Sequence, residues 1–339
     1  MIQASRSPSS SRRLGVLQFG GGPLDLTVHC RPGPTLDLLA STLSLYDVPW
    51  TLTPHKPVQL KVEVASEAVA EAARGDYLEC AQMLVDHAPG GLRATTSRGA
   101  LLVGRFVADG EAWHMTVPAR VPVEGWWPEI EDLVSLIVTT GWRRSGWVPL
   151  HAAGLTRDGV GVLVCAASRG GKTTFSLALA RRGWRVVGDD KLLLGTVDGT
   201  TTVAAVKHML NVDPALRDWF PELGDINHLP IYSEWSPKRR VPLAHIFPDA
   251  PAASMGVSHV VSLVRRDDAH GLAIEEMDVA QTLSTLLHQT VMPNDARVAR
   301  EITARLVAVG QSAHGLRVTV PAGIYRDRDA LQPLEAALR

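Results

Sequence analysis

One segment constrains the fold of this 339-residue chain more than any other: residues 166–174, with the sequence AASRGGKTT. An uninterrupted apolar run at residues 160–165 precedes it, and an amphipathic stretch at residues 175–182 follows it. Strand, glycine-containing loop and helix in this order fit the phosphate-loop pattern GxxxxGK(S/T), with Ala166 where the first glycine is usual. A fully apolar strand is typical of a sheet covered on both faces, so the segment predicts an α/β domain.

In such a loop the backbone N–H groups point at phosphate oxygens, the lysine neutralises the β- and γ-phosphate charge, and the hydroxyl after it binds Mg²⁺. Here those roles fall on Lys172 and on the hydroxyl of Thr173, and Gly183 is expected to end the following helix. The residues predicted to bind the nucleotide are Ser168, Arg169, Gly170, Gly171, Lys172, Thr173 and Thr174. The alternative is a glycine-rich turn with an exposed lysine.

Two adjacent carboxylates, Asp189 and Asp190, follow a second apolar run at residues 184–188. That run predicts a strand, and ligands of α/β sheets collect at the carboxyl ends of strands. Like charges side by side repel unless cations are close, and Mg²⁺ and Lys172 would supply those cations. The alternative is a solvated turn of two aspartates.

His151 lies in residues 147–166, which read as two strands around the Asp158-Gly159 pair, a sequence suited to a tight hairpin. Antiparallel pairing sets Leu155 opposite about Val162, so that His151 lies opposite about Ala166. The imidazole is therefore predicted to reach the mouth of the phosphate loop. The alternative is a packed, hydrogen-bonded histidine without a catalytic role.

The character of the chain changes near residue 145. We expect a disordered tail at residues 1–13, an N-terminal α+β domain at 14–144 and a P-loop domain at 145–339. In the N-terminal domain, short apolar segments separated by turn residues predict an antiparallel sheet. The expected strands are residues 16–19, 24–29, 58–64 and 101–107, and the expected helices are residues 66–87 and 128–140.

The P-loop domain continues beyond the paired aspartates with a polar, proline-rich region at residues 213–251. Strands are expected at residues 260–264 and 272–277, and helices at residues 279–289 and 296–309. Within the polar region, Lys238 and Arg239 belong to a run of three bases in a proline-bounded loop. They either close over the triphosphate, as positioned cations do in phosphoryl transfer, or form a solvated face.

Composition narrows the function classes. The chain has 34 basic and 35 acidic residues, so no basic excess favours nucleic-acid binding. No apolar run approaches the roughly 20 residues that span a bilayer, and the N-terminus lacks a signal-peptide core. Three cysteines without a CxxC pair favour a reducing compartment, and we expect a cytoplasmic protein. The histidines show no zinc-site spacing.

Three motifs, LHAAGL, AASRGGKTT and RRGWRVVGDD, resemble the C-terminal domain of the HPr kinase/phosphorylase family. The likeness is greatest to its relatives that tailor peptide natural products such as lasso peptides, and it covers residues 145–195 well. It implies a P-loop kinase domain of the HPr kinase/PEP carboxykinase-like type, which uses ATP and Mg²⁺ and forms oligomers. It further implies that Asp189 is the general base, with His151 beside it, and that Asp190 supports the metal.

This chain also departs from that family. Thr174 stands where the bifunctional enzymes have a glutamate, and their glycine-rich downstream segment is missing. These departures weaken the expectation of phosphorolysis and of HPr as the substrate. The sequence predicts an ATP-dependent kinase that acts on a hydroxyl, most simply serine of a peptide or small protein. We expect the N-terminal domain to help recognise that substrate. The alternative function is a nucleotide-binding regulator or ATPase switch that transfers no phosphate.

Overall fold

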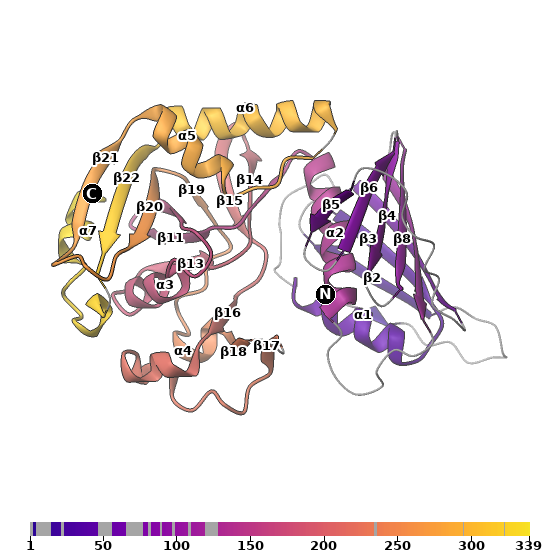
Figure 1. Ribbon diagram of the computed structural model, residues 1–339, viewed down its shortest axis with the longest axis horizontal. Helices are drawn as coiled ribbons and strands as arrows, with labels where there is room; N and C mark the ends of the chain where they lie inside the picture. Colours follow the sequence, from indigo (N-terminus) through magenta and orange to yellow (C-terminus); the bar gives the residue numbers. More distant parts are fainter. Residues whose placement is uncertain are drawn as a thin grey trace. The chain divides into compact units, whose positions relative to one another are not determined.

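The computed structural model describes residues 3–4, 15–21, 24–46, 56–65, 77–80, 83–88, 90–96, 99–107, 110–118, 128–233, 236–293, 295–321 and 323–339. The chain divides into two compact units, Met1–Ser145 and Gly146–Arg339 (Figure 1). Each unit is built around its own sheets. Across the described residues, no helix combines the length and apolarity needed to cross a membrane.

The N-terminal unit contains a nine-stranded sheet of order β1-β2-β3-β4-β9-β8-β7-β6-β5. Its strands are β1 (Gln3–Ala4), β2 (Gly15–Gly21), β3 (Leu24–Cys30), β4 (Lys56–Ala65), β5 (Tyr77–Cys80), β6 (Met83–Ala88), β7 (Gly91–Thr96), β8 (Leu101–Val107) and β9 (Gly110–Pro118). Alternating burial along β3 and β7 matches the two-residue period of a strand with one face in a core. The strands expected at residues 16–19, 24–29, 58–64 and 101–107 are confirmed.

Two expectations for this unit are wrong. The sheet is mixed, because β4 lies parallel to both β3 and β9. The helix expected at residues 66–87 is replaced by β5 and β6 where the structure describes that range, and residues 66–76 lie outside the described part. Antiparallel pairing of β5 with β6, and of β6 with β7, overrides the helix propensity of this segment. In the tail expected at residues 1–13, Gln3 and Ala4 form β1 and pair with β2. The other residues of that range lie outside the described part of the chain.

Two helices complete the N-terminal unit, α1 (Pro34–Ser44) and α2 (Pro128–Arg144). In α2, which confirms the helix expected at residues 128–140, Ile130, Val134 and Ile137 are buried at helical spacing. Near its end, Arg144 forms an ion pair of 3.1 Å with the buried Glu111 of β9. The helix is therefore fixed to the sheet by apolar packing and by one largely buried ion pair.

The C-terminal unit is organised around a six-stranded sheet of order β13-β11-β12-β20-β22-β21. Its strands are β11 (Ala153–Arg157), β12 (Val160–Cys165), β13 (Arg185–Gly188), β20 (His259–Arg265), β21 (Ala273–Met277) and β22 (His314–Val320). Strands β12, β20 and β22 are parallel, and β13 has the same direction because both β12 and β13 pair antiparallel with β11. The carboxyl ends of these four strands therefore lie along one edge of the sheet.

Two smaller sheets belong to the same unit, with orders β10-β14-β15-β19 and β16-β18-β17. Their strands are β10 (Val148–Leu150), β14 (Leu192–Val197), β15 (Thr200–Ala205), β19 (Ser254–Gly256), β16 (Met209–Val212), β17 (Ile231–Ser233) and β18 (Ser236–Pro242). Three short helical turns, η1 (Pro214–Asp218), η2 (Pro221–Leu223) and α4 (Leu243–Ile246), complete the region expected to be polar and proline-rich. The basic run at residues 238–240 is wrongly expected as a loop, because it forms part of β18.

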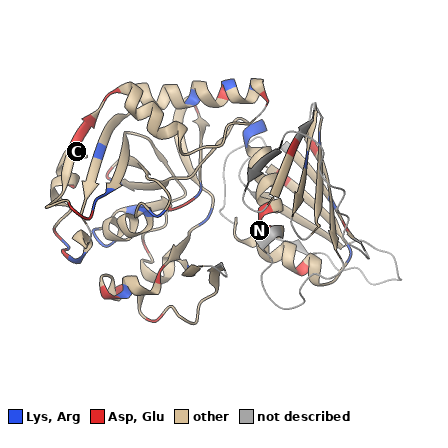
Figure 2. Cartoon of the chain, in the orientation of Figure 1, with Lys and Arg blue, Asp and Glu red and all other residues tan. Residues whose placement is uncertain are grey.

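Four more helical segments complete the unit: α5 (Val279–Leu287), α6 (Ala296–Ser312), η3 (Ile324–Arg326) and α7 (Gln332–Ala337). The helices α5 and α6 confirm those expected at residues 279–289 and 296–309. Helix α5 begins with a capping box in which the Asp278 side chain accepts from the N–H of Gln281. Charged residues of both signs lie along α6, including the pair Arg297 and Glu301 (Figure 2).

Helix α3 (Lys172–Ala180) packs on the large sheet through Phe175, Leu177 and Leu179, all fully buried. It ends as its sequence predicts: Gly183 has φ +87, its N–H donates to Ala180 O, and the N–H of Trp184 donates to Leu179 O. This left-handed termination turns the chain back into β13. The phosphate-loop segment and the two aspartates thus lie at the same edge of the sheet.

Candidate functional site

The loop between β12 and α3 exposes the amino end of the helix. Gly171, at the helix N-cap, has φ +93 and contributes no side-chain cap, and Arg169 also has positive φ, +61. A Cβ atom at Gly170 would lie 2.8 Å from Ala166 Cβ, so this tight turn excludes larger residues there. Uncapped N–H groups and the positive end of the helix dipole favour an anion at this position.

Lys172 is the first residue of α3, and its side chain returns across the loop. Its Nζ donates a hydrogen bond of 3.0 Å to Ala166 O, and the residue is only 8% exposed. Burial lowers the pKa of this ammonium, while the negative charges of Asp190 and Asp189 oppose that change. The charge of Lys172 therefore lies at the first residue of the loop.

Asp189, directly after β13, is buried beneath the amino end of α3. Thr173 Oγ1 donates to one of its carboxylate oxygens at 2.7 Å and Ser176 Oγ donates to the other at 3.3 Å. Burial raises the pKa of Asp189 to about 6, although both hydroxyl donors lower it. A threonine hydroxyl beside a carboxylate is a set of hard oxygen ligands, which suits Mg²⁺. Thr173 and Asp189 thus fit the metal that the phosphate loop implies.

Asp190 has a different environment. His151 Nε2 lies 3.0 Å from its carboxylate, and the side chains of His151 and Asp190 are 52% and 28% exposed. Burial alone would raise the pKa of Asp190, but the hydrogen bond and charge of His151, with the charges of Lys207 and Lys191, hold it well below its ordinary value. Asp190 is therefore an ionised carboxylate that solvent or a substrate can reach.

The position of His151 follows from the hairpin. Leu155 pairs with Val162 and Ala153 pairs with Val164, which confirms the register expected from the sequence. His151 lies two residues before that ladder, and its N–H donates to Gln289 O at 2.7 Å. Its main chain thus links the loop region to the end of α5.

A pocket of about 830 Å³ opens beside the loop. One wall is formed by residues 166–170 and His151, and the other by the end of β20 and the last turn of α5 with the residues after it. The α5 side of the second wall is polar, with Ser284, Thr285, His288 and Gln289, whereas the β20 side contributes the apolar Leu263 and Val264 together with Arg265 and Asp267.

The two basic residues predicted to bind the nucleotide are placed differently. The positive charge of Lys238 contributes to the lowered pKa of Lys172, so Lys238 lies near the loop. Arg239 pairs in β18 with Val212, and its Nη1 donates to Leu229 O at 3.3 Å. Lys238 therefore lies near the candidate site, whereas the side chain of Arg239 makes its hydrogen bond close to the β16-β18-β17 sheet.

Three residues of this region were missed by the sequence analysis. Ser176 lies one turn after Thr173, and that helical spacing beside an acidic pair is the signal that would have found it. Lys207 and Gln289 come from distant segments, and no local pattern marks them.

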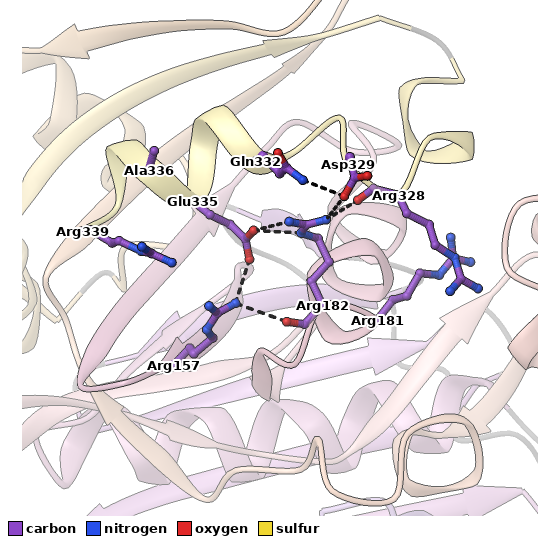
Figure 3. A pocket seen from close by; sticks show the side chains of 9 residues that line it. All are labelled: Arg157, Arg181, Arg182, Arg328, Asp329, Gln332, Glu335, Ala336 and Arg339. Carbon is purple, nitrogen blue, oxygen red and sulfur yellow. Dashed lines mark hydrogen bonds and ion pairs between the residues drawn. The ribbon is translucent and has the colours of Figure 1, made fainter.

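A second pocket, of about 650 Å³, lies at the other end of α3 (Figure 3). Five arginines line it, but acidic groups pair with most of them. Glu335 accepts from Arg157 at 2.9 Å and from Arg182 at 2.6 Å and 2.9 Å, and Arg182 also contacts Asp329. This cluster fixes α7 to α3 and to the β11–β12 hairpin.

Comparisons with known proteins complete the description. No protein-family model matches the chain, and no curated protein matches it. Among solved structures it is similar to the Hpr(Ser) kinase/phosphatase from Coxiella burnetii, with 14% sequence identity and a TM-score of 0.32. That match covers 56% of this chain and 97% of the other.

Proposed function

We propose that this protein is an ATP-dependent kinase that transfers the γ-phosphate to a hydroxyl, that of serine in a peptide or small protein. The observation that carries the proposal is the pair His151–Asp190, 3.0 Å apart and partly exposed at the edge that bears the phosphate loop. A nucleotide switch needs no accessible carboxylate beside its phosphates, whereas a kinase needs a group that accepts the proton of the acceptor.

The chemistry assigns one task to each group. ATP supplies the phosphoryl group, and Mg²⁺ neutralises charge on its phosphates. The acceptor oxygen bonds to the γ-phosphorus while the bond between that phosphorus and the oxygen leaving with ADP breaks, and the hydroxyl proton passes to a carboxylate. Lys172, with the uncapped N–H groups of α3, stabilises the negative charge of the phosphates.

The contacts favour roles for the two aspartates that are exchanged relative to those that the family resemblance implies. Both oxygens of Asp189 accept hydroxyl hydrogen bonds on α3, and the residue is 4% exposed, which suits a group that orients Thr173 and the metal. Asp190 is ionised and within reach of a substrate, so we assign it the orientation of the acceptor hydroxyl and the receipt of its proton. Its lowered pKa makes it a weak base, which a loose phosphoryl-transfer transition state tolerates because the acceptor oxygen gives up its proton late in the transfer. His151 then acts as a positioning residue for that carboxylate.

Finer aspects of this proposal rest on the sequence alone. They are a role in tailoring a peptide natural product, substrate recognition by the N-terminal unit, assembly into a homo-oligomer and a cytoplasmic location. Neither nucleic acid nor membrane is part of the proposed activity.

The direct test incubates the protein with radiolabelled ATP, Mg²⁺ and the peptides encoded next to its gene. We expect a phosphoester on serine that is stable to acid and labile to base, located by mass spectrometry. Acid-labile phosphate would indicate phosphohistidine or an acyl phosphate and would contradict the proposal. Release of inorganic phosphate without any labelled peptide would instead support the ATPase switch.

A further inference from the structure

The pocket between the phosphate loop and α5 has two chemically different walls. The loop wall offers backbone N–H donors and the charge of Lys172, which suit phosphate. The α5 wall offers hydrogen-bond acceptors. His288 Nδ1 lies 2.7 Å from Ser284 O, and because a carbonyl only accepts, Nδ1 carries the proton. In the neutral imidazole, Nε2 is then an acceptor.

Gln289 adds a second acceptor to that wall. The residue is 8% exposed, and its side-chain oxygen is buried without a hydrogen-bond donor among the residues that the structure describes. A buried amide oxygen without a donor has lost its water without gaining a partner, so this side chain gains by turning toward a donor in the pocket. Its main-chain oxygen already accepts from His151, which fixes its distance from the proposed catalytic pair.

The position of Lys172 indicates which end of the nucleotide faces this pocket. In a phosphate loop the lysine contacts the β- and γ-phosphates. Here its Nζ lies 3.0 Å from Ala166 O, and Ala166 and His151 both line the pocket. The terminal phosphate is therefore expected at the pocket mouth, and the nucleoside points away from it.

We propose that this pocket binds the phosphoryl acceptor, a serine-bearing peptide segment, whose N–H and O–H donors bind His288 and Gln289. The inference rests on the proposed kinase function and adds to it the residues that select the acceptor. A peptide supplies closely spaced amide and hydroxyl donors, which match the two acceptors His288 and Gln289 better than an anionic ligand does. At about 830 Å³, the pocket has room for a segment of a few residues.

The test compares three variants on α5 and after it. Ser284→Trp fills the pocket, Gln289→Leu removes the amide while keeping a similar size, and Ala280→Trp adds the same bulk at an exposed position that is not part of the pocket wall. The probes are a fluorescent ATP analogue with Mg²⁺ for binding, and a serine-centred degenerate peptide library with labelled ATP for transfer. Circular dichroism verifies folding of each variant.

We expect Ser284→Trp to lower transfer at least about tenfold, and Gln289→Leu to raise the KM for a selected library peptide about three- to tenfold. The affinity for the ATP analogue should change less than about twofold in both, and Ala280→Trp should behave as the parent. Weaker ATP-analogue binding with unchanged transfer at saturating nucleotide would assign the pocket to the nucleoside and overturn the proposal. Unchanged transfer and binding in both pocket variants would overturn it as well.

The parent protein separates this inference from the proposed function. A parent that transfers phosphate to library peptides, with pocket variants that do so equally well, contradicts the acceptor pocket alone. A parent that binds the ATP analogue and labels no library peptide contradicts the pocket as a site for serine peptides. A parent that neither binds the analogue nor transfers phosphate contradicts the kinase itself.

Discussion

The two ends of α3 carry basic side chains in opposite situations. At the amino end, Lys172 donates a hydrogen bond to a carbonyl oxygen, and among the described residues no side chain caps the helix at Gly171. At the carboxyl end, Arg181 forms an ion pair with Glu222. Arg182 forms ion pairs with Glu335 and Asp329 (Figure 3). One end can therefore bind a foreign anion, while the charges of the other end are used within the fold. An arginine-lined pocket is thus not by itself an anion site.

The largest effect on phosphoryl transfer should come from a substitution at the amino end of α3. Lys172→Ala removes the cation that stabilises the transferring phosphoryl group, so we expect the rate of transfer to fall about 10³-fold or more. The far-ultraviolet circular dichroism spectrum should stay unchanged. Single-turnover transfer and calorimetric titration of ATP·Mg²⁺ measure the effect. Tight nucleotide binding and unchanged turnover in a folded variant would rule out a phosphate loop.

The next effect separates the paired aspartates. Asp190→Asn removes the accessible proton acceptor, so transfer should fall about 10²- to 10⁴-fold with little change in nucleotide affinity. Asp189→Asn should instead raise the Mg²⁺ concentration needed for half-maximal transfer, because the group that orients Thr173 loses its charge. Titrating Mg²⁺ for both variants distinguishes them. The reverse pattern would return the base to Asp189, as the resemblance implies.

The buried carboxylate also predicts a pH dependence of stability. Burial raises the pKa of Asp189 in the folded protein to about 6, above its ordinary value of 3.8, so the folded state binds this proton more tightly than the unfolded chain. The stabilising contribution is full below about pH 4 and is lost as the pH rises through about 6. We expect the stability of the parent relative to Asp189→Asn to fall by about 2–3 kcal/mol between pH 4 and 7. Urea unfolding without nucleotide measures this, and parallel pH profiles would contradict it.

The smallest effect is expected at the carboxyl end of α3, where the basic side chains form ion pairs within the fold. Glu335 accepts from Arg157, Arg182 and Trp184, so Glu335→Gln should lower the free energy of unfolding by about 2 kcal/mol without changing ATP affinity. The matched control is Asp329→Asn, whose side chain is 72% exposed and whose loss should cost about 0.5 kcal/mol or less. A large loss of nucleotide affinity in Glu335→Gln would mean that the two ends of the helix are not independent.

Local patterns predicted much of the C-terminal unit. The Asp158-Gly159 turn and antiparallel pairing predicted the register that sets Leu155 opposite Val162, and the apolar run with its glycine loop predicted β12 and α3. These features depend on residues close together in the sequence. The roles assigned to individual site residues stay predictions, since geometry places the groups and only measurement shows what they do.

Features that depend on pairing between segments, rather than on the pattern within one segment, were not predicted. The segment Tyr77–Cys80 pairs with Met83–Ala88 as the edge of a nine-stranded sheet, and that sheet, rather than the segment's own composition, determines its conformation. In the same way, the N–H of His151 finds its acceptor in Gln289. A single sequence contains no pattern that reports such meetings of separate segments.

The contact between Arg157 and Glu335 joins residues 178 positions apart. Until residue 335 has left the ribosome, the tip of the β11–β12 hairpin and the end of α3 lack their shared carboxylate. Contacts of such long sequence separation slow folding because the entropy of closing the intervening chain is lost before they form. The half of this unit that bears the phosphate loop is therefore synthesised early, but its contacts are completed only when the last residues are made. We expect its incomplete sheet to need shielding from aggregation during synthesis, for example by chaperones.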